Sequence, residues 1–296
     1  MYTYTLYGLT LATPFPCAAL TPAASGTQPD LQVVEGEVPL HLAAPHAQEK
    51  NWEAAPGLYL LRSGKRAGRF LVENGQKITL QRGPAAQDDL LALALLDSVI
   101  VAALRQRGKL VLHANTAYTP GGAVAISGVS GAGKSTTLTA LLQRGCSMLA
   151  DDITVLQFDA QGRVEALPGV PQMNLLEDAA AGLDFDIRAY PRHQWRTGKA
   201  LVPTHEQMHP SPAPLSALYL LEKADIDQIR LEKLTGTEKF IAAQSCIYGP
   251  MLPAEHPALF PLFSAFIEQT AVYRLTRPAS RWSVDEVTDI ILHTEN

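Results

Sequence analysis

The chain has 296 residues, with 24 Lys and Arg against 29 Asp and Glu, and a formal net charge of −5 at pH 7. This balance leaves no basic surface typical of nucleic-acid binding, and 47% hydrophobic residues predict a substantial folded core. Three cysteines, Cys17, Cys146 and Cys246, are too few for a disulfide framework and form no paired metal-binding motif. We expect no signal peptide and no membrane span, because the longest apolar run, residues 90–104, is shorter than the required length of about 20 residues. The sequence therefore predicts a soluble, cytoplasmic protein that binds neither nucleic acid nor membrane.

Residues 1–87 are expected to form a β-rich accessory domain. Short runs rich in β-branched and aromatic residues, separated by turn residues, occur at 2–7, 31–34, 57–61, 69–72 and 77–80. The stretch rich in Pro, Ala and Ser at residues 14–29 predicts an exposed loop. No motif in this part of the chain points to chemistry, and its position alone makes it a candidate for substrate docking.

From residue 88 the pattern changes, which predicts a second domain over residues 88–296. Residues 88–107 form a predicted helix with acids at its start, basic residues in its last turn and Gly108 after it. Apolar strands then alternate with helices, at 110–112, 123–127, 147–150, 153–158, 163–167, 215–221 and 228–234 for strands and at 135–144, 238–247, 257–269 and 284–293 for helices. Residues 153–158 and 163–167 predict a hairpin, and a proline-rich loop precedes residue 215. This order predicts an α/β fold.

One motif stands between a predicted apolar strand and a predicted helix. The segment from Gly128 to Ser135 matches G-x-x-x-x-G-K-[ST], in which glycines let backbone N–H groups face phosphate oxygens. Lys134 then supplies charge to the β- and γ-phosphates and the Ser135 hydroxyl is a magnesium ligand. The predicted nucleotide-binding residues are Gly128, Val129, Ser130, Gly131, Ala132, Gly133, Lys134, Ser135 and Thr136. A plain glycine-rich turn is the alternative.

Two adjacent acids follow the predicted strand at 147–150. Asp151 and Asp152 stand where a phosphate-binding protein needs a carboxylate for magnesium. In an extended chain their side chains would point to opposite sides, so that one faces the metal and the other a substrate hydroxyl. Because like charges raise the pKa of one partner, the pair also suits a general base near neutral pH. A solvated acidic turn is the alternative.

His113, the segment 128–136 and the pair Asp151 and Asp152 together resemble the catalytic domain of the HPr kinase/phosphorylase family. The set is more similar still to HPr-kinase-like serine kinases associated with peptide natural products, including kinases of lasso-peptide precursors. The specific match covers residues 113–152, and the opening residues 6–11 are loosely similar.

The resemblance implies a P-loop α/β core with a mixed sheet, ATP and Mg²⁺ as cofactors, and a peptide or protein with an acceptor serine as substrate. It implies Asp151 as the base with His113 as its partner, Lys134 as a ligand of the phosphates, and Ser135 with Asp152 as metal ligands. The sequence does not decide which of the two aspartates is the base and which binds the metal. The family's glycine-rich signature is not found at residues 166–175, where the sequence reads ALPGVPQMNL. The resemblance therefore favours an acceptor other than HPr. It leaves open whether the protein has phosphorylase activity and whether it forms a homo-oligomer.

Catalysis of phosphoryl transfer also needs positive charge at the transferring group. The cluster of Arg192, Arg196 and Lys199 is the best placed in the sequence, and Lys199 is our choice from it. Trp195 in the same segment could stack on a base or cap the core. An ordinary solvated basic loop is the alternative.

Two other functions fit parts of the sequence. A GTPase switch would use the D-x-x-G match at residues 159–162 and the segment 221–225, where Glu222 replaces the asparagine expected to contact guanine. However, D-x-x-G is common in hairpin turns. A nucleotide-binding regulatory module without phosphotransfer is the other alternative.

Overall fold

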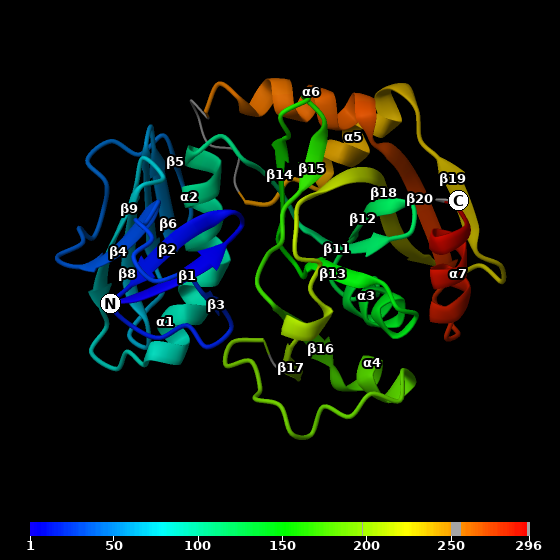
Figure 1. Ribbon diagram of the computed structural model, residues 1–296, viewed down its shortest axis with the longest axis horizontal. Coiled ribbons are helices and arrows are strands. Elements are labelled where there is room, and N and C mark those ends of the chain that lie inside the picture. The colour runs from blue at the N-terminus through cyan, green and yellow to red at the C-terminus, as the bar shows by residue number, and fades with distance from the viewer. Residues whose placement is uncertain (197, 250–255, 295–296) are drawn as a thin grey trace. The chain divides into compact units, whose positions relative to one another are not determined.

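The computed structural model describes residues 1–196, 198–249 and 256–294 (Figure 1). The chain forms two compact units, one of residues 1–111 with 248–261 and one of residues 112–247 with 262–296. The boundary predicted between residues 87 and 88 falls inside the first unit, which continues through the following helices. No helix in the described ranges has the length and apolar character needed to cross a membrane.

The first unit contains a nine-stranded mixed sheet in the order β3-β1-β2-β4-β9-β8-β7-β6-β5. Its strands are β1 Tyr2–Leu6, β2 Leu9–Thr13, β3 Thr21–Pro22, β4 Leu31–Glu35, β5 Ala47–Gln48, β6 Trp52–Ala55, β7 Leu58–Arg62, β8 Gly68–Glu73 and β9 Lys77–Arg82. Strand β4 runs parallel to β2 and β9, and the other pairs are antiparallel. In β8 alternate side chains are buried, which is the period of a strand with one face on the core. The N-terminal part of the chain is therefore β-rich.

A helical segment interrupted by a π-helical turn packs on this sheet. It consists of α1 Asp88–Ala94, the π-helical segment Leu95–Val99 and α2 Ile100–Gln106, where one continuous helix was predicted. Inside the π-helical segment Asp97 has non-helical dihedral angles (φ −107°, ψ −116°), and its carboxylate accepts a 2.6 Å hydrogen bond from the Tyr248 hydroxyl. The interruption follows from this acid, because a carboxylate in an otherwise apolar helix is satisfied only where it reaches a donor.

The second unit is a mixed α/β structure. After β10 Leu110–Leu112, which spans the boundary between the units, its strands are β11 Ala114–Thr119, β12 Gly122–Ser127, β13 Ser147–Ala150, β14 Thr154–Phe158, β15 Val164–Ala166, β16 Gln172–Leu176, β17 Lys199–Pro203, β18 Ala213–Ala224, β19 Arg230–Lys233 and β20 Ala271–Pro278. Its helices are α3 Lys134–Gln143, α4 Glu177–Gly182, the 3₁₀ turn His205–Gln207, α5 Gly236–Ser245, α6 Leu259–Gln269 (which begins before residue 262) and α7 Val284–Thr294.

The main sheet of the second unit places three parallel strands side by side. Its order is β14-β15-β18-β12-β11-β13, with β20 paired on the opposite side of β18 from β12 and β19 beyond β20. Strands β12, β18 and β20 are parallel, and the remaining pairs are antiparallel. The carboxyl ends of parallel strands meet at one edge of a sheet, which is where ligands bind in many α/β proteins. The side chains of Lys223 and Arg277, paired in register, stand near that edge.

Helix α3 covers this sheet next to α7. Strand β12 is buried along nearly its whole length, as expected of a parallel strand covered on both faces. The core includes Ile126 from the sheet, Leu138 from α3 and Ile291 from α7. At the surface Arg144, after α3, forms ion pairs with Asp285 (3.2 Å) and Asp289. Helices α3 and α7 are thus joined by apolar packing and by charge.

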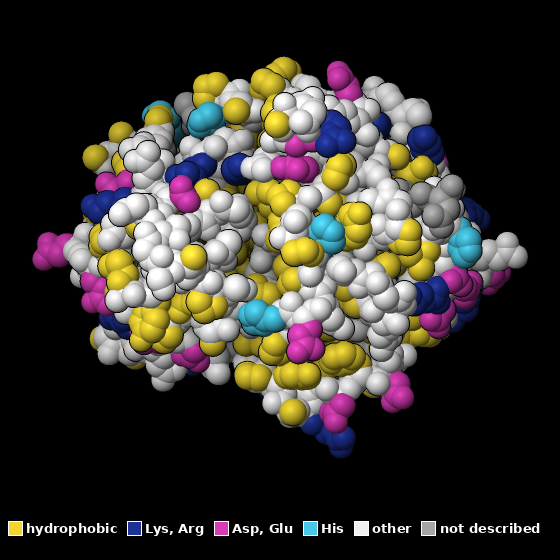
Figure 2. All heavy atoms as spheres, in the orientation of Figure 1, with side chains coloured by type: hydrophobic (Ala, Val, Ile, Leu, Met, Phe, Trp, Pro, Cys, Tyr) yellow, Lys and Arg dark blue, Asp and Glu magenta, His cyan; other side chains and the backbone are white. Residues whose placement is uncertain are grey.

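The predicted hairpin of residues 153–167 is present as β14 and β15, with the turn at 159–162. The antiparallel pair β16 and β17 was not predicted, and only the end of β17, at Pro203, reaches the proline-rich stretch interpreted as a loop. This pair matters because it carries two residues of the site described below. On the face shown in Figure 2, Lys and Arg side chains are scattered among Asp and Glu instead of gathered in one patch.

Candidate functional site

A cleft of about 880 Å³ opens within the second unit where β12, β18 and β20 end. Its walls come from the loop after β12, the start of α3, β16 with α4, β17, and the segment between β20 and α7. Of the described residues lining it, six are Lys or Arg and two are Asp, namely Lys134, Arg196, Lys199, Lys223, Arg277, Arg281, Asp152 and Asp178. This excess of positive charge suits an anionic ligand.

The glycine-rich loop forms one wall of the cleft and leads directly into α3. Gly128 has φ +148°, and a Cβ there would lie 2.4 Å from the Leu221 carbonyl oxygen, so only glycine fits beside β18. Gly133 has φ +115° at the position just before α3. The Lys134 ammonium donates a 2.7 Å hydrogen bond to the Gly128 carbonyl, which folds the side chain back over the loop. Burial lowers the pKa of Lys134.

The acidic pair lies at a turn after β13, and the prediction of an extended chain there is wrong. Asp152 has φ +68°, in the left-handed region. Its backbone N–H donates a 3.1 Å hydrogen bond to the side-chain oxygen of Asn115, which holds the turn. The left-handed turn at Asp152, and not the alternation of side chains along a strand, therefore gives the two carboxylates different surroundings.

Asp151 is held by three donors. The Asn115 amide donates to one carboxylate oxygen at 2.7 Å, and the backbone and side-chain N–H groups of Asn174 donate to the other at 2.8 and 3.1 Å. Burial, with the nearby charge of Asp152, raises the pKa of Asp151 to about 6 despite these hydrogen bonds.

Asp152 is the acid that lines the cleft. Its carboxylate forms an ion pair with Arg196, and one of its oxygens lies 3.8 Å from Nδ1 of His113. Burial alone would raise the pKa of Asp152, but Arg196 and His113 hold it below its ordinary value. His113, expected beside Asp151, thus lies within ion-pair distance of Asp152, and burial lowers the histidine's own pKa.

Asn115 connects the acidic pair to the loop. This side chain on β11 is fully buried, and the amide nitrogen that binds Asp151 also lies 3.5 Å from the Ser135 hydroxyl. Sequence analysis missed Asn115 and Asn174. A signal is available at Asn174, which stands between Met173 and Leu175 in a strand, because an amide buried among apolar residues requires partners.

Only two of the three residues in the predicted basic cluster line the cleft. Arg196 and Lys199 line the cleft, whereas Arg192 forms an ion pair with Glu177 at 3.0 Å. Trp195 is 40% exposed and is not among the described cleft-lining residues.

Three cations, Lys223, Arg277 and Arg281, and one tryptophan of the cleft were not predicted, since they come from distant strands and loops. The side chain of Lys223, on β18, lines the cleft. Arg277, on β20, also lines it and donates a 2.9 Å hydrogen bond to the Ala132 carbonyl of the glycine-rich loop. Trp282, between β20 and α7, also lines the cleft.

Oxygen atoms suitable for a hard cation stand near the start of α3. They belong to the Ser135 hydroxyl and the Asp152 carboxylate, which both line the cleft, and to the Asp151 carboxylate, which is linked to Ser135 through Asn115. In the described parts of the chain, no three His, Cys, Asp or Glu side chains are grouped closely enough to hold a metal ion by themselves.

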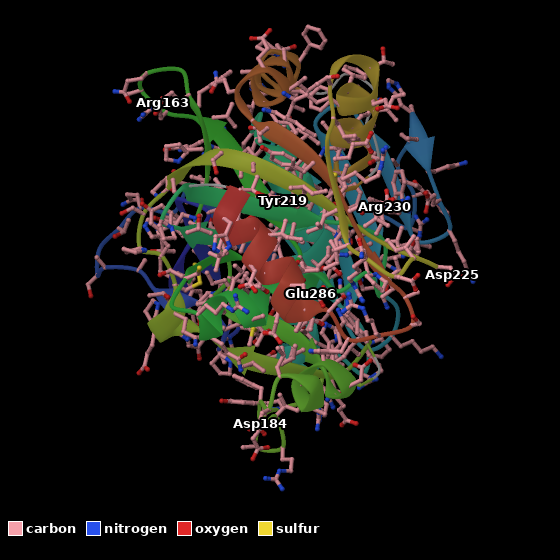
Figure 3. The ribbon with its side chains drawn as sticks, turned by 90° about the vertical axis from the view of Figure 1, so that its right-hand side faces the viewer. Arg163, Asp184, Tyr219, Asp225, Arg230 and Glu286 are labelled. Atoms are coloured by element: carbon pink, nitrogen blue, oxygen red, sulfur yellow. The ribbon has the colours of Figure 1, made fainter. Side chains whose placement is uncertain are left out.

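The D-x-x-G match lies elsewhere in the second unit. Asp159 accepts hydrogen bonds from the backbone of Gln161 and Arg163 at 2.8 Å and pairs with the Arg163 side chain at 2.7 Å. Figure 3 shows Arg163 at the tip of the hairpin, away from α7 with its labelled Glu286. The match is explained by the chemistry of a hairpin turn.

No protein-family model matches the chain, and no curated protein matches it. Among solved structures, it is similar to the Hpr(Ser) kinase/phosphatase from Coxiella burnetii, with a TM-score of 0.35 and 14% sequence identity over 62% of this chain and 89% of that chain. A similarity this low shows neither the family nor the function of this chain.

Proposed function

We propose that the chain is an ATP- and magnesium-dependent kinase that transfers the γ-phosphoryl group to a hydroxyl, with a serine of a peptide or protein as the acceptor. The observation that carries the proposal is the hydrogen-bond link through Asn115 between Ser135, at the start of α3, and the pair Asp151 and Asp152. A phosphate-binding loop alone would suit many nucleotide-binding proteins. A buried connection from that loop to two carboxylates suits phosphoryl transfer.

The donor side of the proposed reaction uses the loop and the surrounding cations. Backbone N–H groups of the loop and the N-terminus of α3 bind the phosphates, and Lys134 leaves the Gly128 carbonyl to contact them. Arg277, which touches the loop at Ala132, adds charge from β20. Catalysis of phosphoryl transfer depends mainly on such positioning and charge.

The oxygen donors at the start of α3 fit magnesium. This ion is usually held by one or two carboxylates together with substrate phosphates and water, so a cluster of three protein acids is not required. Ser135 and Asp152 would hold it, since Asp152 lines the cleft and its low pKa keeps it ionised. When bound, the ion would neutralise charge on the phosphates.

The acceptor side uses Asp151. Asp151 is not among the described cleft-lining residues, but a carboxylate has about four acceptor positions, and the three donors on Asp151 leave one for a hydroxyl that enters from the cleft. Its pKa of about 6 is closer to neutrality than that of an ordinary aspartate, which makes it a stronger base. The serine oxygen attacks the γ-phosphorus, its proton passes to Asp151, and ADP leaves. Arg196 and Lys199 supply positive charge at the same wall of the cleft.

The test is incubation of the protein with Mg²⁺, γ-labelled ATP and the peptide products of neighbouring genes, followed by mass spectrometry of the acceptor. We expect a labelled serine with the wild type and with Asp186→Asn, an exposed acid outside the cleft, and none with Lys134→Ala or Asp151→Asn. Asp151→Asn should still bind ATP. Equal labelling with Lys134→Ala would refute this site. If Asp151→Asn binds ATP and keeps the protein's full function in the cell, the regulatory module without phosphotransfer is favoured instead.

A further inference from the structure

The cleft has a second part that the proposed phosphate chemistry does not use. It lies between α4 and the start of α7 and is lined by small and apolar side chains together with one aromatic ring, namely Ala179, Gly182, Trp282, Val284 and Val287. Most of the charged side chains of the cleft lie elsewhere, and this part, flanked by Asp178 and Arg281, offers apolar surface. A ligand that fills the whole cleft must therefore be anionic at one end and flat or apolar at the other.

Trp282 is the aromatic surface of this part. Its side chain is 48% exposed, yet the edge of its indole rests on α4, since a Cβ at Gly182 would lie 2.4 Å from the ring. The absence of a side chain at Gly182 therefore allows the ring to lie against the helix. A large aromatic side chain that is supported at its edge and remains half-exposed in a cleft is suited to stacking on a planar ligand.

Ser283 supplies a second, independent observation. The residue is only 3% exposed and lines the cleft, but its hydroxyl oxygen has no hydrogen-bond partner among the described residues. A buried hydroxyl without a partner costs free energy, so a native structure usually provides one, from the protein or from a ligand. Ser283 follows Trp282 in the chain, so the unpartnered hydroxyl lies close to the stacking surface.

We propose that this part of the cleft is a nucleoside-binding subsite, in which the base of a nucleoside triphosphate stacks on Trp282 and the Ser283 hydroxyl hydrogen-bonds the nucleoside. The inference rests on the proposed function for the position of the triphosphate at the glycine-rich loop. It assigns base recognition to Trp282, whereas the sequence had offered Trp195.

The test compares two ligands that differ only in the nucleoside. Binding of ATP and of inorganic tripolyphosphate, each with Mg²⁺, is measured by calorimetry for the wild type, Trp282→Ala, Trp282→Phe and Ser283→Ala. We expect Trp282→Ala to weaken ATP binding about ten- to a hundredfold and to leave tripolyphosphate binding within about twofold. Trp282→Phe should keep most of the ATP affinity, and Ser283→Ala should lower it about three- to tenfold.

Trp195→Ala is the matched control, because it removes an exposed tryptophan that does not line the cleft. It should leave both affinities unchanged, and Gly182→Ala, which displaces the indole without removing it, should reproduce part of the Trp282→Ala effect. Equal weakening of both ligands by Trp282→Ala, or no weakening of either, would overturn the subsite. Because binding is measured without transfer, a selective loss for ATP in a protein that labels no acceptor would uphold the subsite and refute the kinase. No binding of either ligand by the wild type would refute both.

Discussion

At the scale of single residues, the site shows how two identical side chains can acquire different chemistry. Asp151 and Asp152 are adjacent, but the first accepts hydrogen bonds from two asparagines and the second pairs with Arg196. The amide donors and Lys199 do not offset burial and the charge of Asp152, so the pKa of Asp151 rises to about 6. The guanidinium holds the pKa of Asp152 low. The residue type alone could not assign these roles.

This difference predicts a pH dependence. If Asp151 is the base, kinase turnover should fall as the pH drops through about 6, because the carboxyl becomes protonated. Turnover of the wild type is to be measured from pH 5 to 8, with ATP binding followed in parallel. A rate that stays constant through pH 6 while ATP remains bound would contradict the role of Asp151.

The raised pKa of Asp151 also predicts how the stability of the protein depends on pH, which can be measured without turnover. Its value in the fold lies above the ordinary 3.8, so between about pH 4 and 6 the folded protein binds more protons than the unfolded chain. The free energy of unfolding contributed by this group therefore decreases as the pH rises through that range. Asp151→Asn does not titrate, so its stability relative to the wild type should rise from pH 4 to 7 in urea denaturation.

At the scale of elements, the glycine-rich loop depends on its neighbour β18. Gly128 and Gly131 both have positive φ, but only at Gly128 would a Cβ meet backbone, the Leu221 carbonyl oxygen at 2.4 Å. No atom lies within 4 Å of a Cβ at Gly131. The first glycine is therefore required by packing between two elements and the second only by local backbone conformation.

Alanine substitution should separate these two requirements. Gly131→Ala should cost about 1–2 kcal/mol of stability from its backbone conformation alone. Gly128→Ala should cost more and should also weaken ATP binding more strongly, because the loop must move away from β18. Thermal unfolding and calorimetric binding of both variants provide the comparison, and equal effects would contradict a packing role for Gly128.

At the scale of the whole molecule, the three cysteines are distributed so that they report on the two units separately. Cys17 is buried in the first unit, where burial raises the pKa of its thiol to about 12. Cys246 is buried in the second unit, and Cys146 is partly exposed there. Because a buried thiol reacts only after the surrounding structure opens, each of the two buried groups measures the opening of its own unit.

Thiol alkylation in mild denaturant should therefore distinguish ligand binding to one unit. Cys146 should react first in the native protein. At an ATP concentration about 100 times the Kd, the ligand should slow alkylation of Cys246 about a hundredfold by stabilising the second unit. Alkylation of Cys17 should not change, and its equal protection, measured by peptide mass spectrometry, would indicate that the two units open together.

The sequence by itself determined the features that depend on neighbouring residues. The glycine-rich loop, the strand before it, the start of α3 and the β14–β15 hairpin were predicted because glycine conformation, turn chemistry and apolar periodicity act within a few residues. The same local signals placed Asp151 and Asp152 directly after β13, although the left-handed turn at Asp152 was not foreseen.

Only the tertiary structure decided which distant residues complete the cleft. Asn115, Asn174, Arg277 and Trp282 come from β11, β16, β20 and the segment after β20, and no local pattern marks them as partners. The π-helical turn at Asp97 has the same origin, because it depends on a hydrogen bond to a tyrosine 151 positions later in the chain. Hydrogen bonds and charges act through space, whereas the periodicities of a sequence act along the chain.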